Sequence, residues 1–139
     1  MGGRGTTRKT TDTSACPCGA GREYGECCGP LHRAETSAAT AEALMRSRFS
    51  AFVVGDVDHL LRSWHPQTRP AGLTLDPRLR WTRLEVLATE RGGLFDTTGT
   101  VEFRAHYRDR GRPGTLHERS RFHREDGEWV YLDGLTDDE

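Results

Sequence analysis

Two stretches in the first half of the chain carry apolar residues at helical spacing. The first starts after Thr40, and its apolar positions are Ala41, Leu44, Met45, Phe49, Phe52 and Val53. The Thr40 hydroxyl can cap this helix, and Gly55 can end it in a left-handed conformation. The second stretch begins after Asp56, a further N-cap, and ends before Pro66. Its apolar face is Val57, Leu60, Leu61 and Trp64.

The second half alternates apolar and polar residues, which is the period of half-buried strands. The residues predicted to share a strand face are Leu84, Val86 and Ala88, then Val101, Phe103, Ala105 and Tyr107, then Leu116 and Phe122, and finally Trp129, Tyr131 and Asp133. Turn residues separate these strands at 92–93, 110–114 and 126–127. Helices followed by an antiparallel meander predict an α+β fold with the helices on one sheet face.

The chain has 139 residues, which is enough for one domain with a short appendage. Residues 1–14 are rich in Gly and Thr without apolar periodicity, so a disordered tail is predicted there. A segment rich in Cys and Gly follows at 15–31, and the α+β domain is predicted at 40–135. The intervening linker has few large apolar residues, so we expect the two parts to unfold separately.

Composition limits the possible partners and the cellular compartment of the protein. The formal charge of −1 gives no general attraction to nucleic acid or to an anionic membrane. No run of 18 apolar residues occurs, and the first residues lack the apolar core of a secretory signal. The sequence therefore predicts a cytoplasmic protein without membrane association, in a compartment where clustered cysteines favour metal over disulfides.

The four cysteines form the strongest chemical signal. Cys16 and Cys18 are separated by one residue, and Cys27 and Cys28 follow as a pair. Four thiolates suit tetrahedral zinc, and the glycines between them allow tight turns. We predict one structural zinc ion per chain, with Arg22 offsetting part of the negative charge.

Three other interpretations of the cysteines stay open. A disulfide is one, although a bond between neighbouring Cys27 and Cys28 is strained. A reactive thiol is another, and no base to activate it is evident. Catalytic zinc is the third, but four cysteines leave no open coordination position.

The cysteine segment CPCGAGREYGECCG, residues 16–29, resembles the SEC-C zinc motif. Together with residues 43–66 and 118–134 it resembles the YchJ family of small bacterial proteins. The resemblance implies a fold like that of nuclear transport factor 2, in which helices close over a curved sheet to form a cone with a pocket. Some family members carry a second zinc motif at the carboxyl terminus, and residues 134–139 of this chain hold no cysteine.

One charged residue falls inside the first apolar helix stripe. Arg48 lies between Leu44, Met45 and Phe52 on the helical wheel, whereas Arg46 lies at the edge and is predicted to be exposed. A buried guanidinium needs a carboxylate or backbone oxygens. Glu118 and Asp133 are the predicted partners, in a structural ion pair or in a ligand pocket; alternatively, the arginine reaches the surface.

The candidate pocket contains eight residues: Arg48, Trp64, His65, Glu118, Ser120, Trp129, Tyr131 and Asp133. Other interpretations accompany them. His65 can be a hydrogen-bond donor at the end of a helix. The rings of Trp129 and Tyr131 can simply be core.

Basic residues alternate with the apolar ones on two predicted strands: Arg104, His106, Arg108, His117, Arg119, Arg121 and His123. This basic face has no interleaved aromatic residues for base stacking, so RNA binding is the weakest of the functions considered.

The sequence contains no triad, nucleotide loop or paired-carboxylate motif, so the interpretation leans away from an enzyme. The first functional hypothesis is an adaptor whose zinc segment docks on a protein partner. The second is a pocket for a small anionic or polar ligand, with or without catalysis. The third is contact with RNA or the ribosome. Either a monomer or a homodimer fits the sequence.

Overall fold

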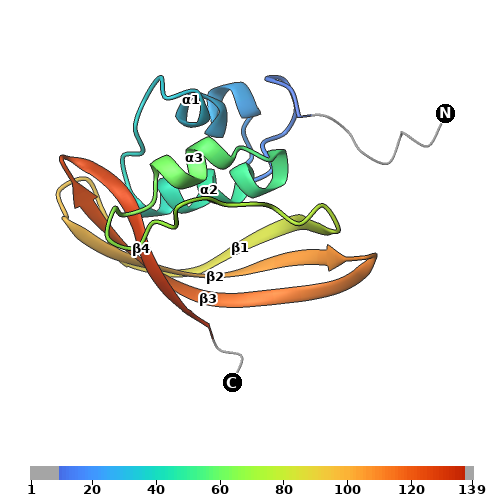
Figure 1. Cartoon of the computed structure of the whole chain (residues 1–139). Helices are drawn as coiled ribbons and strands as arrows, with labels where there is room; N and C mark the ends of the chain where they lie inside the picture. The colour runs from blue at the N-terminus through green and yellow to red at the C-terminus, as the bar shows by residue number, and fades with distance from the viewer. Residues whose placement is uncertain (1–9, 137–139) are drawn as a thin grey trace.

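A computed structural model describes residues 10–136 of the chain. The elements are a 3-10 turn η2 (Tyr24–Glu26) and the helices α1 (Cys28–His32), α2 (Ala41–Val54) and α3 (Val57–Arg62), followed by the strands β1 (Leu79–Arg91), β2 (Thr98–Asp109), β3 (Arg112–Glu125) and β4 (Glu128–Thr136). Figure 1 shows the helices gathered on one side of the sheet, with the amino-terminal segment above them. The predicted α+β fold is confirmed.

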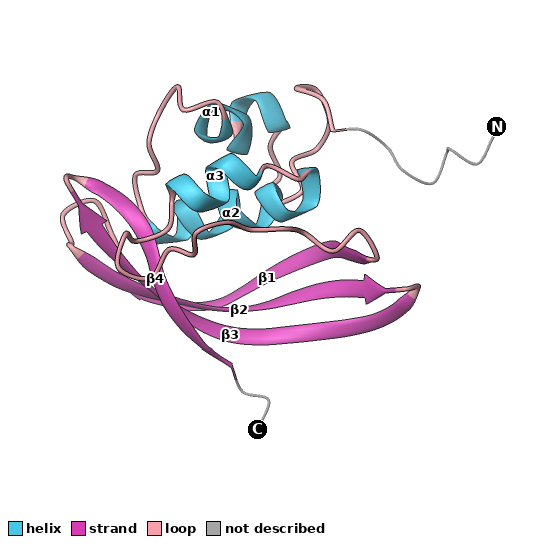
Figure 2. Ribbon diagram, in the orientation of Figure 1, coloured by secondary structure: helices cyan, strands magenta, loops and turns pink. Residues whose placement is uncertain are grey.

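The four strands form one antiparallel meander in the order β1-β2-β3-β4. The long strands curve around the helices, and Figure 2 shows that no helix of residues 10–136 lies on the other sheet face. Irregularities in register interrupt β1 and β4, and such bulges bend the sheet.

The predicted helix caps are present. The Thr40 hydroxyl accepts a hydrogen bond from the Ala43 N–H at 3.0 Å, and Gly55 has a φ of 83°. The Asp56 carboxylate accepts from the His59 N–H at 3.0 Å. The second helix is shorter than predicted. It ends at Arg62, and the chain then pairs with β4 through a bridge between Trp64 and Tyr131.

The core lies between α2 and the concave face of the sheet. Its buried residues include Leu44, Met45 and Phe49 from the helix and Val101, Phe103, Ala105, Phe122 and Trp129 from the strands. The face predicted for β2 is therefore confirmed. Ala88 is exposed, because Leu87 is an extra residue opposite β2 and shifts the alternation beyond it.

A similar bulge in β4 overturns one prediction about the pocket. Tyr131 pairs with Phe122 and Asp133 pairs with Arg121, so Leu132 has no opposite residue. The Leu132 carbonyl instead accepts a hydrogen bond from the Thr68 hydroxyl at 2.7 Å. The extra residue moves Asp133 to the face opposite Tyr131, and the predicted common face is wrong.

Most of the predicted disordered tail, residues 1–9, lies outside the described residues. Residues 10–14 lie against the cysteine segment. The Asp12 carbonyl accepts from the Gly25 N–H at 2.9 Å, and the Asp12 carboxylate pairs with Arg33 at 3.2 Å. Among the described residues, no helix is long and apolar enough to cross a membrane.

Candidate metal centre and sheet cavity

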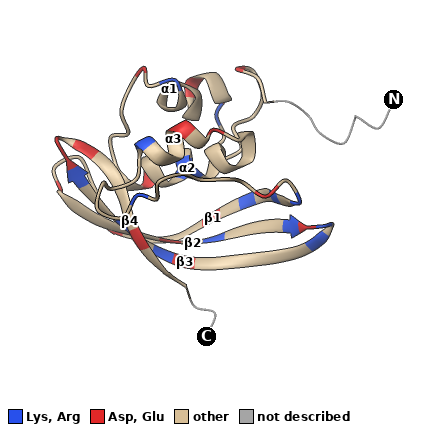
Figure 3. Cartoon of the chain, viewed as in Figure 1, with Lys and Arg blue, Asp and Glu red and all other residues tan. Residues whose placement is uncertain are grey.

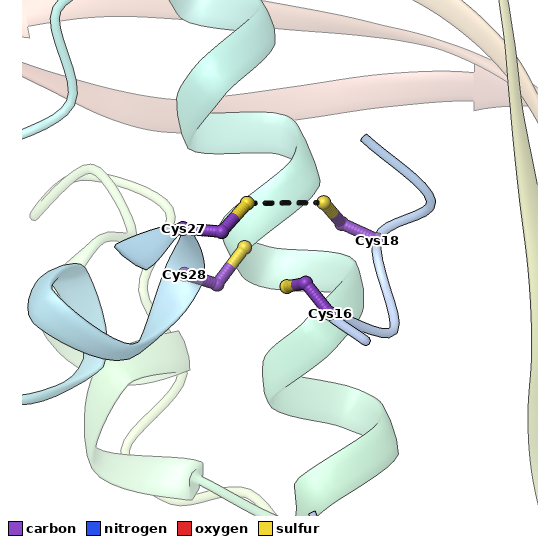
Figure 4. A group of neighbouring side chains, drawn as sticks. All are labelled: Cys16, Cys18, Cys27 and Cys28. Carbon is purple, nitrogen blue, oxygen red and sulfur yellow. Dashed lines mark hydrogen bonds between the residues drawn. The ribbon is translucent and has the colours of Figure 1, made fainter. Parts of the chain in front are cut away.

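The sulfurs of Cys16, Cys18, Cys27 and Cys28 all lie within 4.8 Å of one another. They converge from two short segments (Figure 4), and those of Cys18 and Cys27 are 3.6 Å apart. A tetrahedral zinc site with Zn–S bonds of about 2.3 Å requires sulfurs about 3.8 Å apart. The four thiols are unpaired, so the geometry fits a metal ion and not a disulfide.

The electrostatics of this group also favour a cation. Hydrogen bonds from Cys18 and Cys28 lower the pKa of Cys16. Burial, followed by the charge of Cys18, raises the pKa of Cys27 to about 12. The hydrogen bond that Cys28 makes with Cys16 raises its own pKa. The Cys16 sulfur thus contributes to suppressing the ionisation of Cys27 and Cys28, and four thiolates together require a positive ion.

Local backbone geometry brings the two cysteine pairs together. The Cys16 N–H donates to the Arg22 carbonyl at 2.9 Å, which closes a turn containing Gly19. The φ of 80° at Gly19 is a conformation that favours glycine. A Cβ on Gly29 would lie 2.7 Å from the Tyr24 carbonyl, so a glycine there lets α1 pack against η2.

Helix α2 lies against the four cysteines of the candidate metal site. The Ser50 hydroxyl donates to the Cys28 sulfur at 3.3 Å and lies 3.6 Å from the Cys16 sulfur. Arg46 donates to the Cys18 carbonyl at 2.8 Å and pairs with Glu42. The supporting arginine is therefore Arg46, which had been predicted to be exposed. The Arg22 side chain is exposed.

A buried polar network extends this contact to α3. Tyr24 donates to His32 Nδ1 at 2.6 Å, and His32 Nε2 donates to the Ser47 carbonyl at 2.8 Å. The Ser47 hydroxyl donates to the Leu44 carbonyl, so it accepts from His59 Nε2 at 2.9 Å. Arg62 also donates to the His32 carbonyl at 3.1 Å. These hydrogen bonds join the two parts of the chain, which does not favour the separate unfolding expected from the linker.

Sequence reasoning missed His32, Ser47, Ser50 and His59. The signal available was the spacing of Ser47 and Ser50, which places two small polar residues on one side of an otherwise apolar helix. Both side chains are fully buried.

A cavity of about 160 Å³ lies between α2 and the sheet. We call it the sheet cavity. Five of the eight candidate pocket residues line it: Arg48, Trp64, Glu118, Ser120 and Tyr131. Its other walls are mainly apolar, including Phe49, Phe52, Trp81, Phe103, Leu116 and Phe122. The Tyr131 N–H donates to the Ser63 carbonyl at 2.8 Å, which fixes the strand beside the Trp64 ring.

Arg48 is buried at the wall of the sheet cavity, with 6% of its surface exposed. One nitrogen, Nη1, donates to the Leu60 carbonyl at 2.8 Å and to the Ser63 hydroxyl at 2.7 Å. The guanidinium carbon lies 5.0 Å from the Trp64 ring centre and 4.5 Å from that of Tyr131. Burial lowers the pKa of Arg48 to about 10, so the side chain stays charged at neutral pH.

The predicted ion pair of Arg48 is not formed. No carboxylate of residues 10–136 lies within 4.0 Å of its guanidinium, and the Glu118 charge acts on it from a greater distance. Backbone and hydroxyl oxygens, with two aromatic rings, take the place of the expected carboxylate.

Three candidate residues lie outside the sheet cavity. His65 is buried beside Glu125, with 3.0 Å between Nε2 and the carboxylate, and its Nδ1 accepts from the Gln67 N–H. His65 therefore donates through Nε2, but to Glu125 of β3 and not to the end of a helix. Trp129 is core, and its indole N–H donates to the Ala39 carbonyl at 3.3 Å. Asp133 pairs with Arg121 on the outer face at 2.6 Å.

The outer sheet face is mixed in charge. His106 lies 2.8 Å from Glu85, and His117 lies 2.7 Å from Glu102. Figure 3 shows acidic and basic positions interspersed along the strands. Acidic side chains therefore lie among the alternating basic residues of this face.

Residues 40–134 match the family model described as YchJ, middle NTF2-like domain, and residues 13–30 match that of the SEC-C motif. The chain belongs to the YchJ family. UPF0225 protein SCO1677 of Streptomyces coelicolor is 61% identical over 88% of this chain and 95% of its own length. A UPF0225 protein of Streptomyces avermitilis is 52% identical over 94% of this chain and 92% of its own length.

Two solved structures resemble this YchJ family member. The solution structure of RPA3114, a SEC-C motif containing protein from Rhodopseudomonas palustris, has a TM-score of 0.77 at 36% identity, over 88% of this chain and 98% of that one. A crystal structure of a SEC-C motif containing protein from Psychrobacter arcticus has a TM-score of 0.73 at 26% identity, over 92% and 85%. The fold is thus an NTF2-like domain preceded by a SEC-C motif.

Proposed function

We propose that this protein is a cytoplasmic, zinc-stabilised binder of a small molecule, with the ligand in the sheet cavity. Cys16, Cys18, Cys27 and Cys28 hold one zinc ion, which fixes the amino-terminal segment on α2 and α3. The cavity on the other side of α2 receives the ligand.

The zinc assignment rests on the donor set. Four cysteine sulfurs, here within 4.8 Å of one another, are typical ligands of structural zinc, and hard cations such as Mg²⁺ or Ca²⁺ prefer oxygen. Cys16, Cys18 and Cys28 are buried, so no coordination position is open to a substrate. The metal therefore has a structural role and takes no part in catalysis.

The ligand-binding proposal rests on the unused hydrogen-bond donors of Arg48 beside the cavity. A guanidinium has five N–H donors, and here one nitrogen makes all its hydrogen bonds to the protein. A buried charge with unused donors beside a cavity is costly unless something else accepts from them. A bound ligand would do so.

An adaptor role is a second proposal, and it rests on a different surface. The metal centre is largely buried against α2, which leaves little of it for a partner. The loop between β1 and β2 instead exposes Leu94 by 63% and Phe95 by 96%. Arg124 holds this loop by donating to the Asp96 carbonyl at 2.7 Å and the Leu94 carbonyl at 2.8 Å. A rigidly presented aromatic residue suits a protein partner.

Metal analysis and native mass spectrometry of protein purified without chelator test the zinc site. We expect one zinc per chain, and none in a variant with Cys18→Ser and Cys27→Ser. Zinc-free wild-type protein with oxidised cysteines would refute the metal assignment. The cavity is tested by NMR titration with small aromatic probes, at least one of which should shift the signals of cavity residues and leave those of the outer face unchanged.

A further inference from the structure

The sheet cavity has polar groups of opposite charge in an otherwise apolar wall. Arg48 comes from α2, and Glu118 and Ser120 come from β3. The hydrogen bonds that these groups already make determine which donors and acceptors remain for a ligand.

The donors come from Arg48. Its Nη1 is satisfied by Leu60 and Ser63, and its Nε and Nη2 have no hydrogen-bond partner among the described residues. Within residues 10–136, every fully buried side-chain nitrogen or oxygen has a partner. The Nε and Nη2 groups are therefore not sealed in protein, and the cavity is the space that the guanidinium borders. Together they can donate to a carbonyl or carboxylate oxygen.

The acceptor comes from Glu118. Its Oε2 accepts from the Ser120 hydroxyl at 2.7 Å and from the Tyr131 hydroxyl at 3.4 Å. Burial, then the Glu118 charge, raises the pKa of Tyr131 to about 12, so the phenol keeps its proton. Glu118 Oε1 has no partner within the described part of the chain and can accept from a ligand N–H.

The charges of Arg48 and Glu118 cancel. An anionic ligand is attracted by Arg48 but repelled by Glu118. A cationic ligand is attracted by Glu118 but repelled by Arg48. A neutral ligand with one acceptor and one donor satisfies both residues without adding charge to a desolvated space.

We propose that the sheet cavity selects a neutral, flat molecule with a ring and an adjacent amide-like group, whose carbonyl accepts from Arg48 and whose N–H donates to Glu118. Aromatic primary amides and lactams are the chemical class. This inference rests on the proposed ligand-binding function.

The size and walls of the cavity agree with this class. A cavity of roughly 150 Å³ in another protein takes benzene, and the sheet cavity measures about 160 Å³. Phe49 and Phe52 each lie close to the Trp81 ring, at 6.4 and 6.1 Å between centres, and these rings offer aromatic contacts to a flat ligand.

Four probes of similar shape test the proposal by NMR titration of the zinc-loaded full chain: benzamide, benzoate, benzamidine and toluene. We expect benzamide to bind at least tenfold tighter than the other three. If one of those three binds as tightly or more tightly, the proposed ligand class is wrong while the cavity remains a ligand site. If none of the four shifts a cavity signal at millimolar concentration, both the class and the proposed function fail.

Glu118→Gln gives a second test, with Glu102→Gln on the outer face as its matched control. Removing the Glu118 charge should lower the ratio of benzamide to benzoate affinity at least tenfold, and the control should leave it unchanged. An unchanged ratio in Glu118→Gln would contradict the assigned acceptor. The wild-type probe series decides the matter if that variant does not fold.

Discussion

The Ser50 hydroxyl donates a hydrogen bond to the Cys28 sulfur, 3.3 Å away, from a side chain with no exposed surface. This bond joins the metal centre to the helix whose neighbouring residues line the sheet cavity. A hydroxyl that donates to a metal-binding thiolate stabilises its negative charge and fixes its position.

Replacing this hydroxyl should weaken metal binding. Ser50→Ala is expected to lower zinc affinity by about tenfold or more, because the thiolate loses its donor. Competition with a chromophoric chelator measures the affinity. Ser37→Ala, whose hydroxyl bonds to Glu128 at 3.1 Å away from the cysteines, is the control. Equal affinities in the two variants would show that the bond does not tune the metal.

Zinc removal should destabilise the whole protein and not the cysteine segment alone. The segment contacts α2 and α3 through Ser47, Ser50 and Arg62, so losing it exposes buried polar groups. At a zinc concentration a thousand times the Kd, binding contributes about 4 kcal/mol to stability. Thermal melts followed by tryptophan fluorescence should shift clearly downward after chelation. An unchanged melting temperature would show that the cysteine segment and the α+β domain unfold independently.

His59 should make stability depend on pH. Burial, followed by the charges of His32 and Arg62, lowers its pKa to about 3 despite the opposing effect of Asp56. The unfolded chain therefore binds a proton that the folded protein does not, and stability is present above about pH 6.5 and is lost as the pH falls toward 3. The loss is at most about 1.4 kcal/mol per pH unit.

Urea unfolding of wild type and His59→Gln between pH 4 and 7 measures this loss. The difference between the two free energies of unfolding should narrow as the pH falls, because the variant lacks the titrating ring. Parallel curves for wild type and His59→Gln would show that His59 does not cause the acid sensitivity.

The close approach of the Glu118 side chain should make a glycine necessary at position 134. A Cβ at position 134 would collide with the Glu118 carboxylate, and no positive φ complicates the comparison. Gly134→Ala is expected to cost about 1 kcal/mol, because the Glu118 carboxylate must turn away and lose a hydrogen bond, and Glu118→Ala should remove most of this cost in the double variant. Gly72→Ala, where the added atom meets nothing within 4 Å, should change stability by less than about 0.5 kcal/mol. Additive effects at 134 and 118 would contradict the contact.

The sequence alone determined the features that depend on local chemistry. Thr40, Gly55 and Asp56 mark helix ends because capping involves residues only a few positions apart. The four cysteines fit a metal centre because their spacing closes a short loop. The alternation in β2 gives its buried face directly, since no bulge interrupts that strand's apolar residues.

The tertiary structure decided what depends on register and on contacts between distant segments. One extra residue at Leu132 moved Asp133 out of the pocket, and no local pattern signals such a bulge. Arg48 donates to oxygen atoms of Leu60 in α3 and of Ser63 just after it, and not to a carboxylate. The packing of α2 against α3 places these oxygens beside the guanidinium. Ser50 faces the cysteine segment because that segment folds back over α2, a contact across 22 residues of chain, and Ser47 contacts His32, 15 residues away and just after the segment. Alternation and spacing determine which side-chain groups a segment presents, whereas tertiary packing determines which distant groups they contact.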